Sequence, residues 1–288
     1  MDLLLATHRG APEPTPSDRL LADALAGRGI RVTARPWDSI DPADRTTGMV
    51  CIRSTWDYHL RIDEFRAWIS AFRAEPGRLW NTPDTVLGNL DKVYLRSLEP
   101  LGISLPLTNW LSPGEPLDLG ALFRRTGWRQ AVLKPRVSAS AHGTILVTPQ
   151  SVLSAEDAAS LSATGALLQE FIPEIRTRGE TSLMFFGGEY SHAVCKEVAG
   201  GEFRVQPHLG GAARAVEVSL ELRAFGARVL RAVSAPWVYA RVDVVQAERG
   251  PLLMELELVE PELFFHLAPE RADHLAHRLM LVAQNSTR

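Results

Sequence analysis

Strand-like and helical patterns alternate along the first part of the chain. Residues 3–6 form a short apolar run, and 30–36 and 48–53 have the composition of further strands, whereas apolar side chains recur at helical spacing over 20–25 and 62–72. This alternation predicts a small open α/β domain at the N-terminus. Ligands of such sheets bind beyond the carboxyl ends of the strands, so the loops after the first and third strands line a candidate cleft.

The remaining pattern predicts a mixed central part and a strand-rich second half. Helices are expected over 85–98, 118–126, after 154, over 220–233 and over 269–283. Strands are expected over 131–134, 144–148, 167–171, 182–186, 190–196, 238–245 and 252–258. We therefore expect an N-terminal α/β domain over 1–84, a central αβ part over 85–165 and a strand-rich part over 166–288.

Composition narrows the class of protein without identifying it. The 288 residues are 45% hydrophobic and 23% charged, which is the ordinary globular range. A formal net charge of −3 provides no basic excess for nucleic acid or an anionic membrane. Two cysteines, Cys51 and Cys195, exclude a disulfide scaffold and a four-cysteine zinc site. Because no apolar run approaches the ~18 residues of a membrane span and residues 1–6 lack a basic n-region, we expect a cytoplasmic protein.

The most informative segment is the predicted hairpin near the C-terminus. Glu255 and Glu257 are two residues apart, so on a strand both face one side and Met254 faces the other. If the hairpin is centred on Arg249, Asp243 lies opposite Glu255. Three carboxylates on one face repel one another unless a cation binds, and oxygen-only ligands suit magnesium. A solvated outer face of the sheet is the alternative.

A second candidate site combines two lysines with a polar loop. Lys134 ends one predicted strand, and Lys92 lies earlier, on a predicted helix. The loop after Lys134 contains Ser138, Ser140, His142 and Gly143. Backbone N–H groups and hydroxyls of such a loop can hold phosphates, although the P-loop pattern is missing. Surface solubility is the alternative for both lysines.

Four side chains near the carboxyl ends of the first and third strands are candidates for substrate binding. Arg53 follows the third strand, where its guanidinium could grip a substrate carboxylate with two hydrogen bonds. Asp57 could hold an amino group, and Tyr58 and His8 belong to the same expected cleft. Packing over the small sheet is the alternative for Tyr58 and for its neighbour Trp56.

Four motifs occur in the order and at the spacing of the ATP-grasp superfamily. They are Lys92, the Lys134-Pro135 pair with its loop, Gln169-Glu170-Phe171-Ile172, and the set of Asp243, Glu255 and Glu257. The chain resembles small ATP-grasp ligases related to glutathione synthetase and, more closely, the D-cycloserine synthetase group of antibiotic biosynthesis, through the segment 52–58 and the loop 138–144. The resemblance covers about 48–265. It implies an α/β (α+β) ATP-grasp fold with an N-terminal open α/β domain, a central αβ lid and a strand-rich C-terminal domain.

The resemblance also implies how the nucleotide is held. Lys92 and Lys134 match the two lysines that contact nucleotide phosphates, with the loop beside them. The segment from Gln169 to Ile172 matches the part that frames adenine, and Glu180 matches an acidic residue near the ribose.

The remaining implied roles concern the metal and the reaction. Asp243, Glu255 and Glu257 match the magnesium ligands, although many members have Asn at the last position. Arg204 matches a positive residue that meets the acyl phosphate, and Lys196 is a second candidate for that role.

The leading hypothesis is therefore an ATP- and magnesium-dependent ligase or cyclase. It activates a carboxylate or similar carbonyl of a small amino-acid-like substrate as a phosphate ester, forms a C–N bond and releases ADP and phosphate. Joining two molecules and closing a ring within one both stay open, as does a homodimer. The alternative is a nucleotide-binding protein of the same fold without ligase activity, against which the intact carboxylate set argues.

Overall fold

The N-terminal part is an open parallel sheet covered by helices on both faces. The computed structural model describes residues 2–198, 203–205 and 210–286. The sheet has the order β2-β1-β3-β4, formed by β1 (Asp2–Thr7), β2 (Arg31–Pro36), β3 (Met49–Ile52) and β4 (Leu79–Trp80). Side chains of β1 alternate, so that Leu3 and Leu5 pack with α1 (Pro16–Ala26), and Leu4 packs with α2 (Ile62–Ala71).

The central part is a separate small antiparallel sheet with its own core. Its order is β5-β8-β6-β7, formed by β5 (Thr108–Leu111), β6 (Ala131–Pro135), β7 (Ile145–Val147) and β8 (Ala166–Glu170). Helices α5 (Leu119–Thr126) and α6 (Ala155–Thr164) supply Phe123 and Leu161 to that core. Because β8 pairs with β5 and β6, the central sheet extends to Glu170, and the boundary expected at 165/166 falls inside it.

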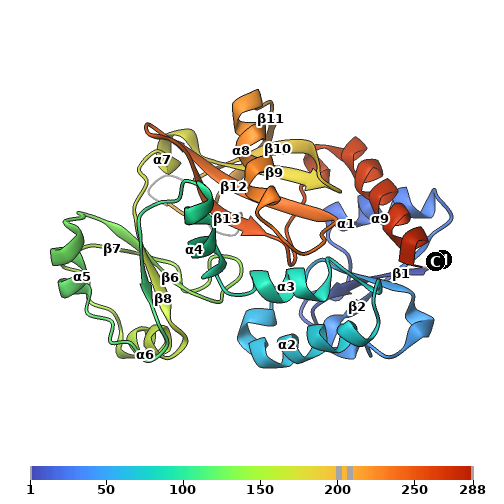
Figure 1. Cartoon of the computed structure of the whole chain (residues 1–288), viewed down its shortest axis with the longest axis horizontal. Coiled ribbons are helices and arrows are strands. Elements are labelled where there is room, and N and C mark those ends of the chain that lie inside the picture. The colour runs from blue at the N-terminus through green and yellow to red at the C-terminus, as the bar shows by residue number, and fades with distance from the viewer. Residues whose placement is uncertain (1, 199–202, 206–209, 287–288) are drawn as a thin grey trace.

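The C-terminal part is built on a larger antiparallel sheet with the order β11-β10-β9-β12-β13. Its strands are β9 (Glu180–Phe186), β10 (Glu189–Glu197), β11 (Ala212–Val216), β12 (Tyr239–Ala247) and β13 (Gly250–Glu257). Three helices complete this part: α7 (Ile175–Arg178), α8 (Leu220–Arg231) and α9 (Ala272–Ser286). Figure 1 shows the central sheet standing apart from the other two, whereas α9 lies beside α1 of the N-terminal domain.

The helix expected over 85–98 is interrupted. It forms α3 (Pro83–Asn89) and α4 (Tyr94–Leu98), with a short irregular stretch between them. In that stretch the N–H of Lys92 donates to the carbonyl of Arg136, and the carboxylate of Asp91 accepts two hydrogen bonds from the Arg136 guanidinium. These contacts with the chain after β6 replace helical hydrogen bonds and direct Lys92 toward the interior.

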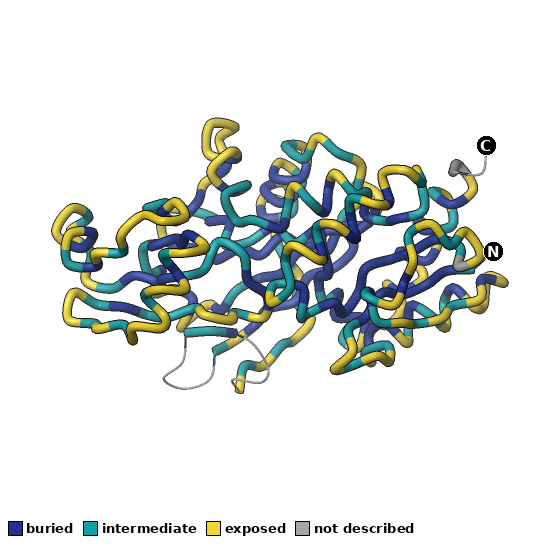
Figure 2. Tube along the Cα trace, turned by 90° about the horizontal axis from the view of Figure 1, so that it is seen from below, coloured by how far each residue is buried: buried dark blue, intermediate teal, exposed yellow. Residues whose placement is uncertain are grey.

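The N-terminal and C-terminal parts share one hydrophobic core. Leu3 and Leu5 of β1 pack with Phe186, Tyr239 and Leu275, which come from β9, β12 and α9. The buried segments in Figure 2 accordingly concentrate where these two parts meet. This arrangement confirms the predicted α/β class, and among the described residues the central sheet contributes none to that core. Among the described helices, none is long and apolar enough to cross a membrane.

Candidate active site

A cavity of ≈500 Å³ lies where the three parts of the chain meet. Its wall takes side chains from β6 and β8 of the central sheet, from β9, β10, β12 and β13 of the C-terminal sheet, and from the segment after β3. The predicted site residues that line it are Tyr58, Lys92, Lys134, Ser138, Ser140, Gln169, Glu170, Phe171, Ile172, Glu180, Lys196, Arg204, Asp243, Glu255 and Glu257. Those that do not line it are His8, Arg53, Asp57, His142 and Gly143.

The predicted pairing of Asp243 with Glu255 is confirmed, but a β-bulge produces it. The hairpin closes with Ala247 opposite Gly250, and the register shifts by one residue between Asp243 and Val244. A β-bulge brings two consecutive side chains toward the same side of the sheet. Met254, expected on the opposite side from Glu255, lines the cavity with it for this reason.

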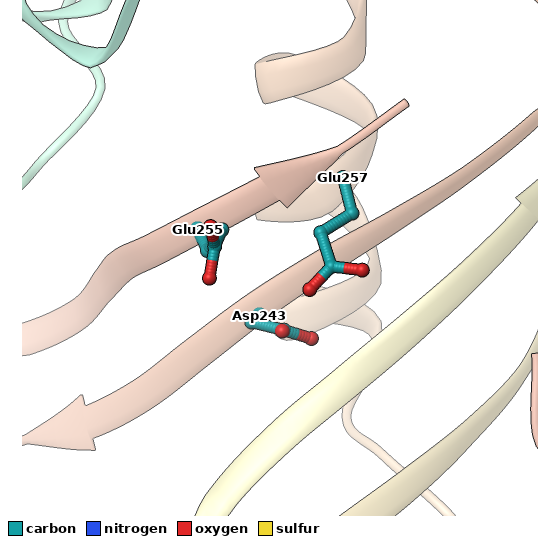
Figure 3. Close-up of side chains that lie close together, drawn as sticks. All are labelled: Asp243, Glu255 and Glu257. Atoms are coloured by element: carbon teal, nitrogen blue, oxygen red, sulfur yellow. The ribbon is translucent and has the colours of Figure 1, made fainter. Parts of the chain in front are cut away.

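The three carboxylates gather on one face of β12 and β13, and Figure 3 shows the carboxyl group of Glu257 pointing toward Asp243. Asp243, Glu255 and Glu257 each offer an oxygen atom, and these atoms all lie within 4.8 Å of one another. Hard oxygen ligands at this spacing fit magnesium, which keeps several of its waters. The set therefore suits the metal that the sequence predicts.

Two cations, Lys196 and Arg241, already compensate the carboxylates of Asp243 and Glu257. Asp243 accepts hydrogen bonds from Ser182 (2.6 Å), from Lys196 Nζ (3.0 Å) and from Arg241. Arg241 also forms an ion pair with Glu257. Because Asp243 is only 2% exposed and holds three donors, its charge is stabilised by the protein itself.

Burial and these partners separate the pKa values of the carboxyl groups. Burial acts to raise the pKa of Asp243, but Arg241 and Lys196 outweigh it and hold the pKa below the usual range. For Glu257, burial dominates and, with the neighbouring carboxylates, raises the pKa to about 7. Burial also raises the pKa of Glu180, which forms an ion pair with Lys196 (2.5 Å).

The lysines of this chain are confined to the cavity. The sequence contains only three, Lys92, Lys134 and Lys196, whereas its other 28 cationic side chains are arginines. All three lysines line the cavity wall. An ammonium group is a compact donor suited to phosphate oxygens. The scarcity of lysine in the sequence could therefore have indicated that Lys196 belongs to the site together with Lys92 and Lys134.

Lys92 and Lys134 hold different partners within the cavity. Lys92 Nζ donates to the carbonyl of Ser138 (3.0 Å) and lies 3.3 Å from Glu255. Lys134 Nζ donates to Gln169 Oε1 (2.9 Å), and burial lowers the pKa of this lysine. Lys92 thus connects the polar loop to the carboxylate cluster. Lys134, in β6, is hydrogen-bonded to Gln169 near the end of β8.

The segment predicted to frame adenine lies at the junction between the central sheet and the β12–β13 hairpin. Glu170 accepts a hydrogen bond from the N–H of Leu107 (2.7 Å) and forms an ion pair with Arg249 at the hairpin turn. Phe171 and Ile172 continue along the cavity wall. Side chains from two parts of the chain therefore hold this segment in place.

The polar loop contributes to the cavity through residues 138–141 and Thr144. Ser138 is buried, and Ser140 takes a left-handed conformation with φ of 52°. Gly143 also has a positive φ, and a Cβ atom there would lie 2.8 Å from Pro135 Cγ. The ring of His142 instead packs 5.0 Å from the ring of His59. Gly143 and His142 therefore shape the loop and its contact with the N-terminal domain, and neither lines the cavity.

The two candidates for the acyl phosphate differ in their surroundings. Lys196 is 7% exposed and is held between Glu180 and Asp243. Arg204 lines the cavity with its guanidinium 5.7 Å from the ring centre of Phe203. Both residues line the cavity, but Lys196 is held by two carboxylates.

The N-terminal candidates are mostly committed to the fold. Arg53 is buried and bonded to Asp18 and to the carbonyl of Pro261, and it does not line the cavity. Asp57 accepts a hydrogen bond from Trp37 Nε1 (2.9 Å), and a ring nitrogen of His8 lies 2.9 Å from the carbonyl of Ser54. None of these three side chains reaches the cavity.

Sequence reasoning missed several residues of the cavity wall. Arg241 precedes Asp243 by two residues, so strand periodicity places both on one face and could have identified it. Trp56 lines the cavity rather than only packing over the small sheet. Glu260 and Phe264 follow β13 in an irregular segment, for which no periodicity was available.

Comparison with known proteins defines the family. Residues 129–263 match the RimK-like ATP-grasp domain, and residues 3–81 match the N-terminal domain of D-cycloserine synthetase DcsG. The chain is 30% identical over 279 residues to the cycloserine biosynthesis protein DcsG of Streptomyces lavendulae, covering 90% of this chain and 91% of that protein. This chain therefore belongs to the ATP-grasp ligase family, and membership implies the use of ATP.

Other relatives match over shorter stretches or in fold alone. A protein of Parasynechococcus marenigrum named "Probable alpha-L-glutamate ligase" is 34% identical over 159 residues, which are 54% of this chain and 32% of that protein. This chain spans 32% to 57% of the length of the first three such ligases.

The crystal structure of D-cycloserine synthetase DcsG superposes with a TM-score of 0.83 at 26% identity, covering 99% of this chain and 100% of that one. D-alanine–D-alanine ligase of Bacillus anthracis, with a TM-score of 0.70 and 13% identity, covers 99% and 97% and shares the fold.

Proposed function

We propose that this protein is an ATP- and magnesium-dependent ligase that forms a C–N bond in a small amino-acid-like substrate. A carboxylate or similar carbonyl oxygen of the substrate takes the γ-phosphoryl group of ATP. An amine then attacks the activated carbon, the C–N bond forms, and ADP and phosphate leave. One observation carries the proposal: Lys92, Lys134 and the carboxylate cluster line the same cavity as the segment from Gln169 to Ile172.

The chain's own residues divide this work. Lys92 and Lys134 bind phosphate oxygens, the segment from Gln169 to Ile172 receives adenine, and Glu180 lies near the ribose. Asp243, Glu255 and Glu257 are the side chains that hold magnesium, which offsets the charge of the phosphates when bound. Arg204 stabilises the acyl phosphate, and Lys196 keeps Glu180 and Asp243 in position.

Ring closure within one molecule is the branch of this chemistry that we favour. The match to the cycloserine biosynthesis protein DcsG spans 90% of this chain, and residues 3–81 match the N-terminal domain of D-cycloserine synthetase DcsG, whereas the match to the Parasynechococcus marenigrum protein covers 54% of this chain. A mass spectrum of the product decides between the branches, since cyclisation yields a product built from one substrate molecule and ligation yields one built from two.

The reaction class is tested by product analysis. The protein is incubated with magnesium, ATP and a panel of amino acids and their short derivatives. Release of ADP and phosphate that depends on one of these compounds is the expected result. Release of AMP and pyrophosphate contradicts the proposal, and substrate-independent nucleotide binding without any turnover supports the alternative of a binding protein.

A further inference from the structure

Glu260 is a buried carboxyl group that faces the cavity without a partner. It follows β13, lines the cavity wall and is 8% exposed. Across the described ranges of the chain, no hydrogen bond or ion pair reaches its side chain. Other carboxylates of the wall have partners: Arg241 pairs with Glu257, Lys92 lies beside Glu255, and Glu262 accepts a hydrogen bond from the N–H of Phe264. A carboxyl group buried in this way has a missing partner that a ligand can supply.

The backbone beside Glu260 is anchored to the N-terminal domain. Arg53 Nη2 donates to the carbonyl of Pro261 (2.9 Å), while its Nε is bonded to Asp18 (2.7 Å). On the other side, Val259 is 4% exposed and belongs to the hydrophobic cluster around Tyr58. Anchors on both neighbours hold Glu260 in place, so its position on the cavity wall is set by the fold.

The surroundings of Glu260 favour an organic cation over a metal ion. Trp56, Tyr58 and Phe264 line the same cavity as Glu260. The charge of Glu260 acts on Tyr58, whose pKa is raised by burial and then by this carboxylate. Aromatic faces beside a carboxylate bind ammonium groups, whereas magnesium prefers several oxygen ligands and waters.

The electrostatics of the cavity are consistent with a cation at this place. Burial raises the pKa of Glu260 well above its usual value, and the charge of Glu257 adds to the shift. The cations nearest in the wall, Arg241 and Lys92, are engaged with other carboxylates. A positively charged ligand would supply the missing opposite charge and favour the ionised carboxylate.

We propose that Glu260 binds the amino group of the small amino-acid-like substrate, carried as an ammonium ion, in a subsite walled by Trp56 and Tyr58. This assignment rests on the proposed function, because it names the substrate class of the same cavity. Arg53 is a positioning residue for this subsite and acts through the backbone of Pro261.

The test is a binding experiment with defined probes. Calorimetry first measures the binding of magnesium with a non-hydrolysable ATP analogue. It then measures the binding of the D and L forms of the common amino acids, and of their N-acetyl derivatives, to that complex. We expect at least one free amino acid to bind and its N-acetyl derivative to fail. Glu260→Gln is expected to weaken that amino acid at least about tenfold, the size of a lost charge-assisted contact, with unchanged nucleotide affinity.

A matched control separates this effect from a general loss of charge. Glu270→Gln makes the same change at a carboxylate whose side chain is 68% exposed and forms an ion pair with Arg271. This control is expected to bind the amino acid as the wild-type protein does. Melting curves of both variants, with and without nucleotide, report whether the fold is retained.

Several outcomes overturn the assignment. One is equal affinity of the Glu260→Gln variant and the wild-type protein for the amino acid, and another is equal binding of free and N-acetylated amino acids. A third is that the wild-type protein binds the nucleotide but no amino acid. The last is that Glu260→Gln changes only the affinity for magnesium. Failure of the wild-type protein to bind the nucleotide contradicts the proposed function instead. The amino acids are then titrated without nucleotide, so that the Glu260 assignment is decided separately.

Discussion

Arg53 and Asp18 form an ion pair in which both side chains are almost completely buried. Arg53 Nε lies 2.7 Å from Asp18 Oδ1, and the side chains are 1% and 2% exposed. Arg53 also donates to the carbonyl of Pro261, which lies 208 residues further along the chain. The residue expected to grip a substrate therefore joins β3, α1 and the segment after β13.

Replacing Arg53 by Ala is expected to destabilise the protein by about 3 kcal/mol or more, because Asp18 would remain buried without its cation. Urea unfolding at pH 7 measures this change. The double variant Arg53→Met with Asp18→Asn, which removes both charges, is expected to lose less stability.

In kinetic measurements on Arg53→Ala, KM for the substrate should rise more than KM for ATP. A single variant as stable as the wild-type protein contradicts the role of this ion pair.

Lys134→Ala is expected to weaken ATP binding at least about tenfold, since a phosphate oxygen loses a charged donor. Lys134 faces the cavity and contacts Gln169 at 2.9 Å, so the effect should appear in nucleotide affinity before it appears in stability. Calorimetry with magnesium and a non-hydrolysable ATP analogue measures it. Arg231→Ala, on the exposed side of α8, is the control. Equal affinity of the Lys134 variant and the wild-type protein would count against the assignment.

Because the three lysines of the chain all line the cavity, amine-directed labelling is expected to report on it. Reductive methylation followed by mass spectrometry measures the modification of each lysine. Magnesium with ATP should protect Lys92 and Lys134, and Lys196 should react slowest because it is 7% exposed and doubly ion-paired. Labelling of Lys92 and Lys134 that is indifferent to ATP would place the nucleotide elsewhere.

Glu255→Gln keeps the side-chain volume and removes one charge from the proposed metal site. We expect kcat to fall by about two orders of magnitude, as for the loss of a strong electrostatic contact. Stability without metal should stay level, because Glu255 is 35% exposed and Lys92 is its one ion-pair partner among the described residues. Turnover and urea unfolding measure the two effects. Normal turnover in this variant removes the metal site and most of the case for ligase chemistry.

His192 is expected to make the protein sensitive to acid. Burial lowers its pKa to about 4, and one ring nitrogen lies 2.9 Å from the carbonyl of Leu263. The unfolded chain takes up this proton near pH ~6.5, so stability falls as the pH drops from there to the folded pKa, by up to about 1.4 kcal/mol per pH unit.

Urea unfolding of His192→Gln across the same pH range checks this expectation. The variant should lose stability less steeply on acidification than the wild-type protein does. His277→Gln, at an exposed position of α9, is the control and should follow the wild-type protein. Parallel pH profiles for His192→Gln and wild type would show that other groups cause the acid sensitivity.

Much of the fold followed from local pattern. Three of the four strands of the N-terminal sheet, the hairpin after β9 and the last helix were predicted from apolar spacing, whereas the two-residue strand β4 was not. The interrupted helix at 90–93 was not predicted, since the contacts of Asp91 and Lys92 with Arg136 replace helical hydrogen bonds. The extent of the central sheet was also missed, because pairing of β8 with β6 joins strands that are distant in sequence.

By itself, the sequence determined which chemistry the chain carries. The two-residue spacing of Glu255 and Glu257 puts them on one strand face, and the hairpin brings Asp243 opposite Glu255. The first relationship depends on strand periodicity, which is a local property of the chain. The second also requires the β-bulge between Asp243 and Val244, which was not predicted from the sequence.

Only the tertiary structure decided which of these groups face the cavity and which are held in ion pairs within the fold. Arg53 and Lys196 carry the charges expected of binding residues, but buried carboxylates from distant segments take up those charges. Glu260 lacks any pattern of its own and reaches the cavity because Val259 and Pro261 are held by the N-terminal domain. The physical reason is that burial and partner choice depend on contacts between distant segments, which local spacing does not encode.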